Sequence, residues 1–142
     1  MRAADWSSDM AKVLIVEDNP ANMTLALFLL QSAGHTVLSA TDAEAGLTLA
    51  RAEQPDLILM DIQLPGMDGL QATVLLKRDA ATRAIPVIAL TALAMKGDEE
   101  RIRAAGCDGY IAKPMRYQEF MATIVAQLAQ KRPDILTTKP TF

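Results

Sequence analysis

The chain has 142 residues, of which 51% are hydrophobic and 22% charged, and its formal net charge is −3. This composition predicts one globular domain with its own core and provides no basic surface for nucleic acid. No segment is long and apolar enough to span a bilayer and the first ten residues lack a secretion signal, so we expect a cytoplasmic protein. One cysteine and one histidine exclude an internal disulfide and a cysteine-based zinc site.

Short runs rich in valine, isoleucine and leucine alternate along the chain with longer stretches of helical periodicity. The runs predict buried strands, and the longer stretches predict amphipathic helices. We expect strands at residues 13–16, 36–40, 57–60, 86–90 and 110–112. We expect helices at residues 20–33, around 45–52, around 70–80, around 97–105 and around 116–130. The sequence therefore predicts five strand-then-helix units.

Finer expectations follow for three of these helices. Gly34 should end the first helix, because glycine commonly follows the last helical turn, and His35 should then lie exposed in a loop. Two other helices carry a row of apolar residues on one face: Ala45, Leu49 and Ala52 in the second helix, and Phe120, Ile124 and Leu128, directed inward, in the last.

Apolar strands that alternate with helices indicate a parallel sheet covered on both sides. We therefore predict an α/β fold, a doubly wound domain spanning residues 11–130. Residues 1–10 and 131–142 are polar or contain proline, and we expect them to be a flexible N-terminal tail and a C-terminal tail, without an effector domain.

Polar side chains stand at the point where four of the predicted strands end. They are Glu17 and Asp18 after the first strand, Asp61 after the third, Thr91 after the fourth, and Lys113 with Pro114 after the fifth. The carboxyl ends of parallel strands meet at one edge of a sheet, where such folds bind their ligands. We therefore expect these side chains to surround one crevice.

Three carboxylates in one crevice would repel each other unless cations neutralise them. Lys113 can neutralise only one of them, and Mg²⁺ suits the others because it binds one or two carboxylates together with water and phosphate oxygens. A carboxylate can also attack phosphorus while a metal and a lysine stabilise the transferred oxygens. Asp61 is therefore a candidate phosphoryl acceptor.

Each of these residues also has a purely local interpretation. Asp18, ahead of Asn19 and Pro20, could cap the first helix, Asp61 could begin a turn, and Lys113 could be solvated. Their joint position at the ends of different strands favours the functional interpretation.

Other classes of protein share parts of this pattern. A flavodoxin-type carrier would bind phosphate with amides and hydroxyls after the first strand, whereas this chain has the acidic EDNPAN there. A phosphatase of the haloacid dehalogenase type needs a second aspartate two residues after its nucleophile, where this chain has Gln63. No P-loop or GxGxxG element is present in the sequence. The remaining alternative is a protein-interaction module with a vestigial phosphorylation pocket.

Taken together, Glu17-Asp18, Asp61, Thr91 and Lys113-Pro114 resemble the receiver domain of two-component response regulators, the CheY-like family. The stretches DIQLPGMDG, AMKGDEERIRAAGC and YIAKP resemble its stand-alone DivK-type subgroup. The resemblance covers residues 11 to about 130. It implies a five-stranded parallel sheet with the flavodoxin-like strand order 2-1-3-4-5 and a single-domain response regulator in a bacterial phosphorelay, a signalling protein rather than an enzyme.

The resemblance implies a metal and phosphoryl site. Asp61 would accept a phosphoryl group from a phosphohistidine on a partner protein. Asp18, Asp61 and the backbone carbonyl of Gln63 would coordinate Mg²⁺, and Glu17 would hold a metal-bound water. Lys113 would contact the phosphoryl oxygens. The protein would thereby assist its own phosphorylation and slow dephosphorylation.

The resemblance also implies a switch beside this site. Thr91 would hydrogen-bond the phosphoryl group, and Tyr110 would turn inward as Thr91 moves, although Tyr110 could equally be a plain core aromatic. The bond between Lys113 and Pro114 would be cis. A further set of residues would border the pocket and control the access of water: Gln63, Ala92 and Leu93.

The implied partners are a histidine kinase, a histidine phosphotransfer protein or both, together with a downstream target protein. The target would bind the fourth helix, fifth strand and fifth helix, residues 95–120, and a homodimer through that face is compatible with the sequence. No nucleic acid or membrane partner is expected. Within this range Asp98, Glu99 and Glu100 suit the start of a helix electrostatically, but they could also form a docking patch.

Overall fold

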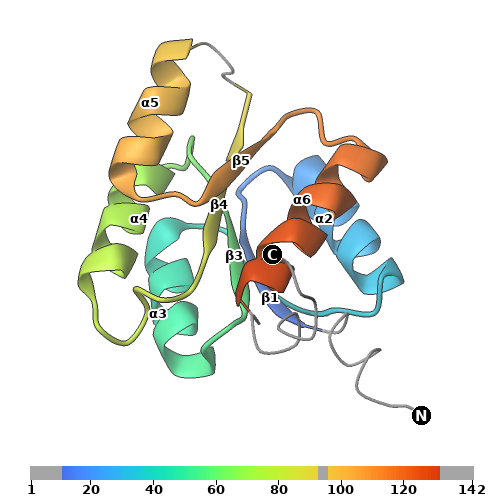
Figure 1. Ribbon diagram of the computed structural model, residues 1–142, viewed down its shortest axis with the longest axis horizontal. Coiled ribbons are helices and arrows are strands. Elements are labelled where there is room, and N and C mark those ends of the chain that lie inside the picture. The colour runs from blue at the N-terminus through green and yellow to red at the C-terminus, as the bar shows by residue number, and fades with distance from the viewer. Residues whose placement is uncertain (1–10, 93–95, 132–142) are drawn as a thin grey trace, which may run out of the picture.

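Five parallel strands form one sheet in the computed structural model, which describes residues 11–92 and 96–131 (Figure 1). The strands are β1 (Lys12–Val16), β2 (Thr36–Ala40), β3 (Leu57–Asp61), β4 (Val87–Thr91) and β5 (Gly109–Ala112). Their order is β2-β1-β3-β4-β5, and each neighbouring pair is parallel. The structure therefore confirms the predicted doubly wound α/β fold and its strand order.

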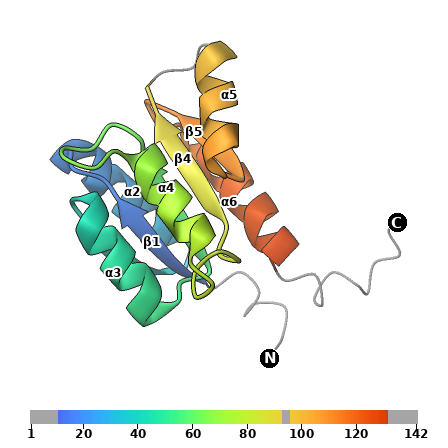
Figure 2. The ribbon, with the colours of Figure 1, turned by 90° about the vertical axis from the view of Figure 1, so that its left-hand side faces the viewer.

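Five helices cover the two faces of the sheet. They are α2 (Pro20–Ser32), α3 (Ala43–Glu53), α4 (Gly69–Arg78), α5 (Lys96–Ala105) and α6 (Tyr117–Lys131). Helices α3, α4 and α5 lie on one face, whereas α2 and α6 lie on the other (Figures 1 and 2). None of these helices, within the described ranges, is both long and apolar enough to cross a membrane.

The three central strands are apolar because both of their faces are covered. Every residue of β3 and β4 is buried, and so are four of the five residues of β1. Alternate residues enter different cores: Leu14 and Val16 pack with α3, α4 and α5, whereas Val13 and Ile15 pack with α2 and α6. Burial on both faces makes the central strands a rigid base for the residues that follow them.

The ends of the helices agree with the local chemistry of the sequence. Asn19 caps α2 by accepting a hydrogen bond from the backbone N–H of Asn22 at 3.0 Å, and Pro20 is the first helical residue. Gly34 follows the helix with a φ of +93°, as predicted. Asp68 and Gln71 cap α4 reciprocally in a capping box.

Two sequence predictions about burial differ from the structure. In α3 the buried residues are Ala43, Gly46, Leu47 and Ala50, whereas in the predicted row Ala45 and Ala52 are exposed and Leu49 is half-buried. A Cβ on Gly46 would lie 2.7 Å from a methyl carbon of Val16, so the helix approaches β1 where it has no side chain. The row predicted for α6, Phe120, Ile124 and Leu128, is buried and is confirmed.

His35 is buried rather than exposed, with 7% of its surface accessible. Its Nδ1 accepts a hydrogen bond from the backbone N–H of Ala11 at 3.1 Å, immediately before β1 begins. His35 therefore joins the start of β1 to the start of β2. This contact could not be predicted from the residues next to His35, because its partner is 24 residues away.

The predicted tails lie largely outside the described residues. Residues 1–10 and 132–142 are not described, and α6 continues to Lys131, the first residue of the predicted C-terminal tail. The boundaries at residues 11 and 130 remain predictions.

Candidate functional site

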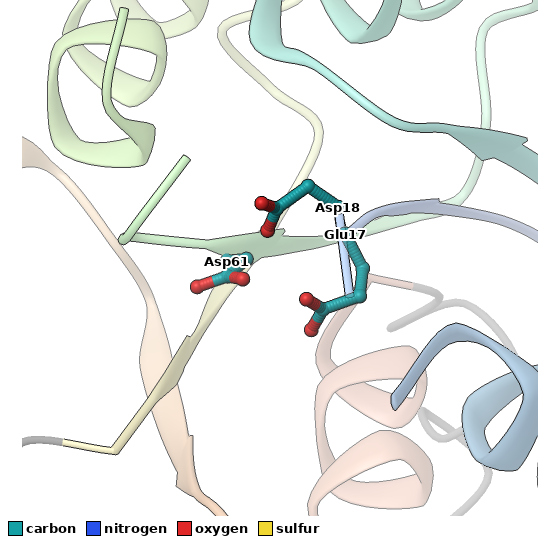
Figure 3. A group of neighbouring side chains, drawn as sticks. All are labelled: Glu17, Asp18 and Asp61. Carbon is teal, nitrogen blue, oxygen red and sulfur yellow. The ribbon is translucent and has the colours of Figure 1, made fainter. Parts of the chain in front are cut away.

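Three carboxylates gather at the carboxyl edge of the sheet. Glu17 and Asp18 follow β1, and Asp61 is the last residue of the adjacent β3. One oxygen from each carboxylate lies within 4.8 Å of the others, and Figure 3 shows the three side chains around a common space. Glu17 and Asp61 are buried, whereas Asp18 is exposed. The group is therefore open to solvent from the side of Asp18.

Backbone hydrogen bonds extend the sheet into the site. The N–H of Glu17 donates to the carbonyl of Ala40 at 3.0 Å, and the N–H of Lys113 donates to the carbonyl of Thr91 at 2.8 Å. Such bonds hold the residues after the strands in register with the strands themselves. The acidic residues and Lys113 therefore have little backbone freedom.

Lys113 completes the group from the end of β5. Its ammonium Nζ lies 2.9 Å from Oε1 of Glu17 and 3.0 Å from Oδ2 of Asp61. Only 13% of the lysine side chain is exposed, so the local interpretation of a solvated lysine is wrong. With every group ionised, three carboxylates and one ammonium leave a local charge of −2.

Burial and neighbouring charges shift two of these groups in the same direction. Burial raises the pKa of Glu17, and the hydrogen bond and negative charge of Asp61 raise it further, against the opposing effects of the Asn19 N–H and Lys113. Burial lowers the pKa of Lys113, but its bonds with the two buried carboxylates outweigh that effect and raise the pKa overall. Lys113 therefore stays charged, while burial and Asp61 favour the protonated form of Glu17.

The local interpretations of the two aspartates fare differently. Asp18 does not cap α2, because Asn19 does. Asp61 does begin a turn, since its Oδ1 accepts a hydrogen bond from the N–H of Gln63 at 2.9 Å while Oδ2 contacts Lys113. The turn holds the Asp61 carboxylate in place and is compatible with a chemical role.

The donor set at this edge fits a hard divalent cation. All three side chains offer oxygen, and the local charge remains negative after Lys113 has paired. Among the described residues, Oε1 of Glu17 is a buried oxygen that has an ion partner but no well-directed hydrogen-bond donor. The exposed position of Asp18 leaves room for water or phosphate oxygens in the shell of the ion. The residues therefore suit Mg²⁺.

The remaining predicted residues lie around this group. Thr91 is fully buried at the end of β4, one residue beyond Leu90, which pairs with Asp61 in the sheet. The bond between Lys113 and Pro114 is cis. Ala92 is exposed at the rim, and Leu93 lies outside the described residues. The roles of these residues, and of the Gln63 carbonyl as a metal ligand, remain predictions.

Tyr110 contacts α5. Its hydroxyl donates a hydrogen bond to Oε2 of Glu99 at 2.6 Å, and its ring packs at the edge of the core beneath α5. Tyr110 and Thr91 nevertheless project from the same face of the sheet, because Thr91 pairs with Ala112, two residues after Tyr110. The contact with Glu99 joins residues eleven positions apart and was not predicted.

Gly69 is a residue of the site that sequence analysis missed. A Cβ at this position would lie 2.1 Å from the carbonyl oxygen of Asp61, so the start of α4 rests directly on the backbone of the candidate acceptor. The absence of a side chain at residue 69 allows the start of α4 to pack against the backbone of Asp61.

Comparisons with known proteins agree with this geometry. The profile of the response regulator receiver domain family matches residues 13–125. The polar-differentiation response regulator DivK of Brucella anthropi is 52% identical over 116 residues, which is 82% of this chain and 94% of that protein. DivK of Brucella ovis has the same identity over the same length.

Solved structures of receiver domains have the same fold. The receiver domain of a sensor histidine kinase from Pseudomonas aeruginosa, with a magnesium ion coordinated in its active-site cleft, has a TM-score of 0.79 at 36% identity and covers 84% of this chain and 98% of its own. The chemotaxis protein CheY4 of Vibrio cholerae has a TM-score of 0.77 at 27% identity and covers 81% of this chain and 96% of its own.

Proposed function

Because this chain belongs to the response regulator receiver family, we propose that it is a phosphorylation-driven switch in which Asp61 accepts a phosphoryl group from a phosphohistidine. One observation above all supports this proposal: Asp61 stands at the carboxyl edge of the sheet between two acidic neighbours and 3.0 Å from the Lys113 ammonium. This arrangement offers a nucleophile together with positive charge for the oxygens that move.

The transfer step follows from the groups in the pocket. A carboxylate oxygen of Asp61 forms a bond to phosphorus as the bond between phosphorus and the histidine nitrogen breaks, and that nitrogen keeps the electron pair and takes up a proton. Lys113, which contacts the Asp61 carboxylate before the transfer, then contacts the phosphoryl oxygens as well. Mg²⁺, held by Asp18, Asp61 and the Gln63 carbonyl with Glu17 on a water, would supply further positive charge to those oxygens.

The donor histidine lies outside this sequence. His35 is the only histidine of the chain, and it is buried beside the start of β2, at the opposite edge of the sheet from Asp61. A histidine kinase or a histidine phosphotransfer protein is therefore the donor in this proposal.

Helix α2 begins beside the pocket and exposes Leu25 and Phe28, with 65% of Phe28 accessible. We assign the docking of the donor to this apolar surface.

Docking on α2 can be tested separately from the chemistry of the pocket. Phe28→Ser should slow transfer from a phosphorylated histidine phosphotransfer domain while leaving phosphorylation by a small donor such as phosphoramidate unchanged. Val125→Ser, on the exposed face of α6, is the matched control because Val125 is also an accessible apolar residue. Equal transfer to both variants would refute the assignment of α2.

The proposed output follows from the negative charge and acceptor oxygens that phosphorylation adds. The buried Thr91 hydroxyl turns to the phosphoryl oxygens, Tyr110 follows into the space beside it, and the surface of α5, β5 and α6 changes. A downstream protein, or a second copy of the chain, would recognise that surface. Gln63, where haloacid dehalogenases carry an acid/base, argues against turnover of foreign phosphates, and the protein only assists its own phosphorylation and dephosphorylation.

The alternative is an interaction module whose pocket is vestigial, and one experiment separates the two functions. Phosphoramidate and Mg²⁺ are added to isotope-labelled protein, and the amide signals of α5 and β5 are followed. The proposal predicts shifts in wild type, none in Asp61→Asn, and phosphorylation without those shifts in Thr91→Ala. The same shifts in Asp61→Asn, or an unchanged wild type, would support the vestigial pocket.

A further inference from the structure

The bond between Tyr110 and Glu99 has the geometry of a strong hydrogen bond. Its length of 2.6 Å lies in the range of hydroxyl–carboxylate bonds, which are about twice as strong as neutral ones. Both side chains are partly buried, so water competes with the bond less than it would at a fully exposed site. The bond connects β5, which adjoins the phosphorylation pocket, to the first turns of α5.

The bond lies at a hollow in the protein surface. Tyr110 and Glu99 line a hollow of about 200 Å³ between α5, β5 and α6, together with Arg103, Asp108 and Thr123. The charged groups that act on the phenol are Glu99 and Arg103 from α5, and Asp108 from the loop before β5 lines the same hollow. Only Glu99 forms a hydrogen bond with the hydroxyl among the described residues. The bond to Glu99 therefore sets the orientation of the ring.

We propose that Glu99 is a positioning residue that holds Tyr110 in the resting orientation, so that its bond must break before the ring can turn toward Thr91. This inference rests on the proposed function. The hydroxyl of an inward ring would leave the Glu99 carboxylate, because the ring would turn away from α5 toward the end of β4. The strength of one hydrogen bond would then set how much of the unphosphorylated protein adopts the phosphorylated arrangement.

A purely structural role makes a different prediction. If the bond only fastened α5 to β5, its loss would lower stability without populating the phosphorylated arrangement. If Glu99 holds the ring back, its loss shifts the resting ring toward the inward position. The orientation of Tyr110 in the absence of phosphate therefore distinguishes the two roles.

The experiment uses the full chain carrying Tyr117→Phe, which leaves Tyr110 as the only tyrosine. The aromatic NMR signal of Tyr110 is recorded before and after phosphorylation by phosphoramidate with Mg²⁺, which defines the resting and phosphorylated positions. Glu99→Gln keeps the shape of the side chain but removes its charge. Glu100→Gln removes the same charge from the neighbouring exposed residue and is the matched control.

The expected result is a Tyr110 signal in unphosphorylated Glu99→Gln that moves toward the phosphorylated position, with an inward population about five-fold higher than in the parent. Glu100→Gln should match the parent. The Glu99 carboxylate, which accepts a hydrogen bond from the phenol, raises the pKa of Tyr110, with burial and the charge of Glu99 adding to the effect and Arg103 opposing it. The absorbance titration of Tyr110 should therefore shift to lower pH in Glu99→Gln alone.

Two outcomes would overturn the inference, and they are distinguishable. If the parent is phosphorylated and its ring signal moves, but resting Glu99→Gln coincides with Glu100→Gln, Glu99 does not hold the ring and the proposed function stands. If neither phosphoramidate nor a phosphohistidine donor phosphorylates the folded parent, the proposed function fails and this inference fails with it. In the first case, a fall in the stability of Glu99→Gln would assign Glu99 a purely structural role.

Discussion

Asp18→Asn tests the electrostatics of the pocket without altering its buried contacts. Asp18 is the exposed member of the acidic group and has no bond to Lys113, whereas Glu17 and Asp61 both contact that ammonium. From the position of Asp18, the surroundings contain two carboxylates and one ammonium, a net charge of −1. Asparagine has nearly the same shape without the charge, so the variant should relieve repulsion in the metal-free protein.

The size of this relief follows from the geometry. At 4.8 Å, the upper limit of the spacing within this group, a carboxylate pair repels by about 1 kcal/mol in water and by about 3 kcal/mol near a protein surface. Because Asp18 is exposed and its charge is screened, the lower figure applies. We therefore expect metal-free Asp18→Asn to be about 1 kcal/mol more stable than wild type at low salt, and the difference should shrink as salt is added.

Urea unfolding of both proteins, with chelator and then with Mg²⁺, measures these quantities. Mg²⁺ should stabilise wild type in proportion to the logarithm of its concentration above the dissociation constant, and it should stabilise Asp18→Asn much less because a ligand is lost. Glu100→Gln, which removes an equal charge from the first turns of α5, should be neutral or slightly destabilised. If metal-free Asp18→Asn were less stable than wild type, the picture of a repulsive group awaiting a cation would be wrong.

Three other predictions concern the same edge of the sheet. Lys113→Ala should slow phosphorylation by about 100-fold but retain Mg²⁺ binding in a calorimetric titration, and loss of binding would make Lys113 part of the metal site. Gly69→Ala should lower the free energy of unfolding in urea by about 1–3 kcal/mol, because its Cβ would lie 2.1 Å from the carbonyl oxygen of Asp61. An unchanged free energy of unfolding would contradict that contact. Because the pKa of Glu17 is raised in the folded protein, its protonation stabilises the fold. This contribution is complete below about pH 4.5, the ordinary pKa of the group, and is lost as the pH rises through the higher pKa of the folded protein. Since the metal needs the ionised form, Mg²⁺ affinity should fall as pH is lowered toward that value, and an equal dependence in Glu17→Gln would assign the effect elsewhere.

The architecture was predictable because the central strands carry the strongest signal in the sequence. Their apolar runs are buried on both faces, and a parallel sheet has few ways to connect them. The buried face of α3 was not predictable from apolar spacing, because the helix meets Val16 of β1 at Gly46, which a hydrophobic pattern does not register. His35 was misjudged for a related reason, since its hydrogen-bond partner Ala11 is 24 residues away.

The pocket could be predicted to the extent that the strand ends determine it. Glu17 and Asp18 follow β1, Asp61 ends β3 and Lys113 follows β5, and the topology alone brings them together. The contact between Tyr110 and Glu99 depends instead on how α5 lies over β5, and the sequence around Glu99 is equally typical of any helix start. Side-chain contacts that cross between elements require the packed structure.

The most direct test of the central claim is the intact mass of the protein after exposure to acetyl phosphate and Mg²⁺. Wild type, Asp61→Asn and wild type with excess chelator are compared, each shown to be folded. The account predicts a labile gain of one phosphoryl group in wild type with metal and none in the other two samples. The same gain in Asp61→Asn, or no gain in wild type even from a phosphohistidine donor, would contradict the assignment of Asp61 as the phosphoryl acceptor.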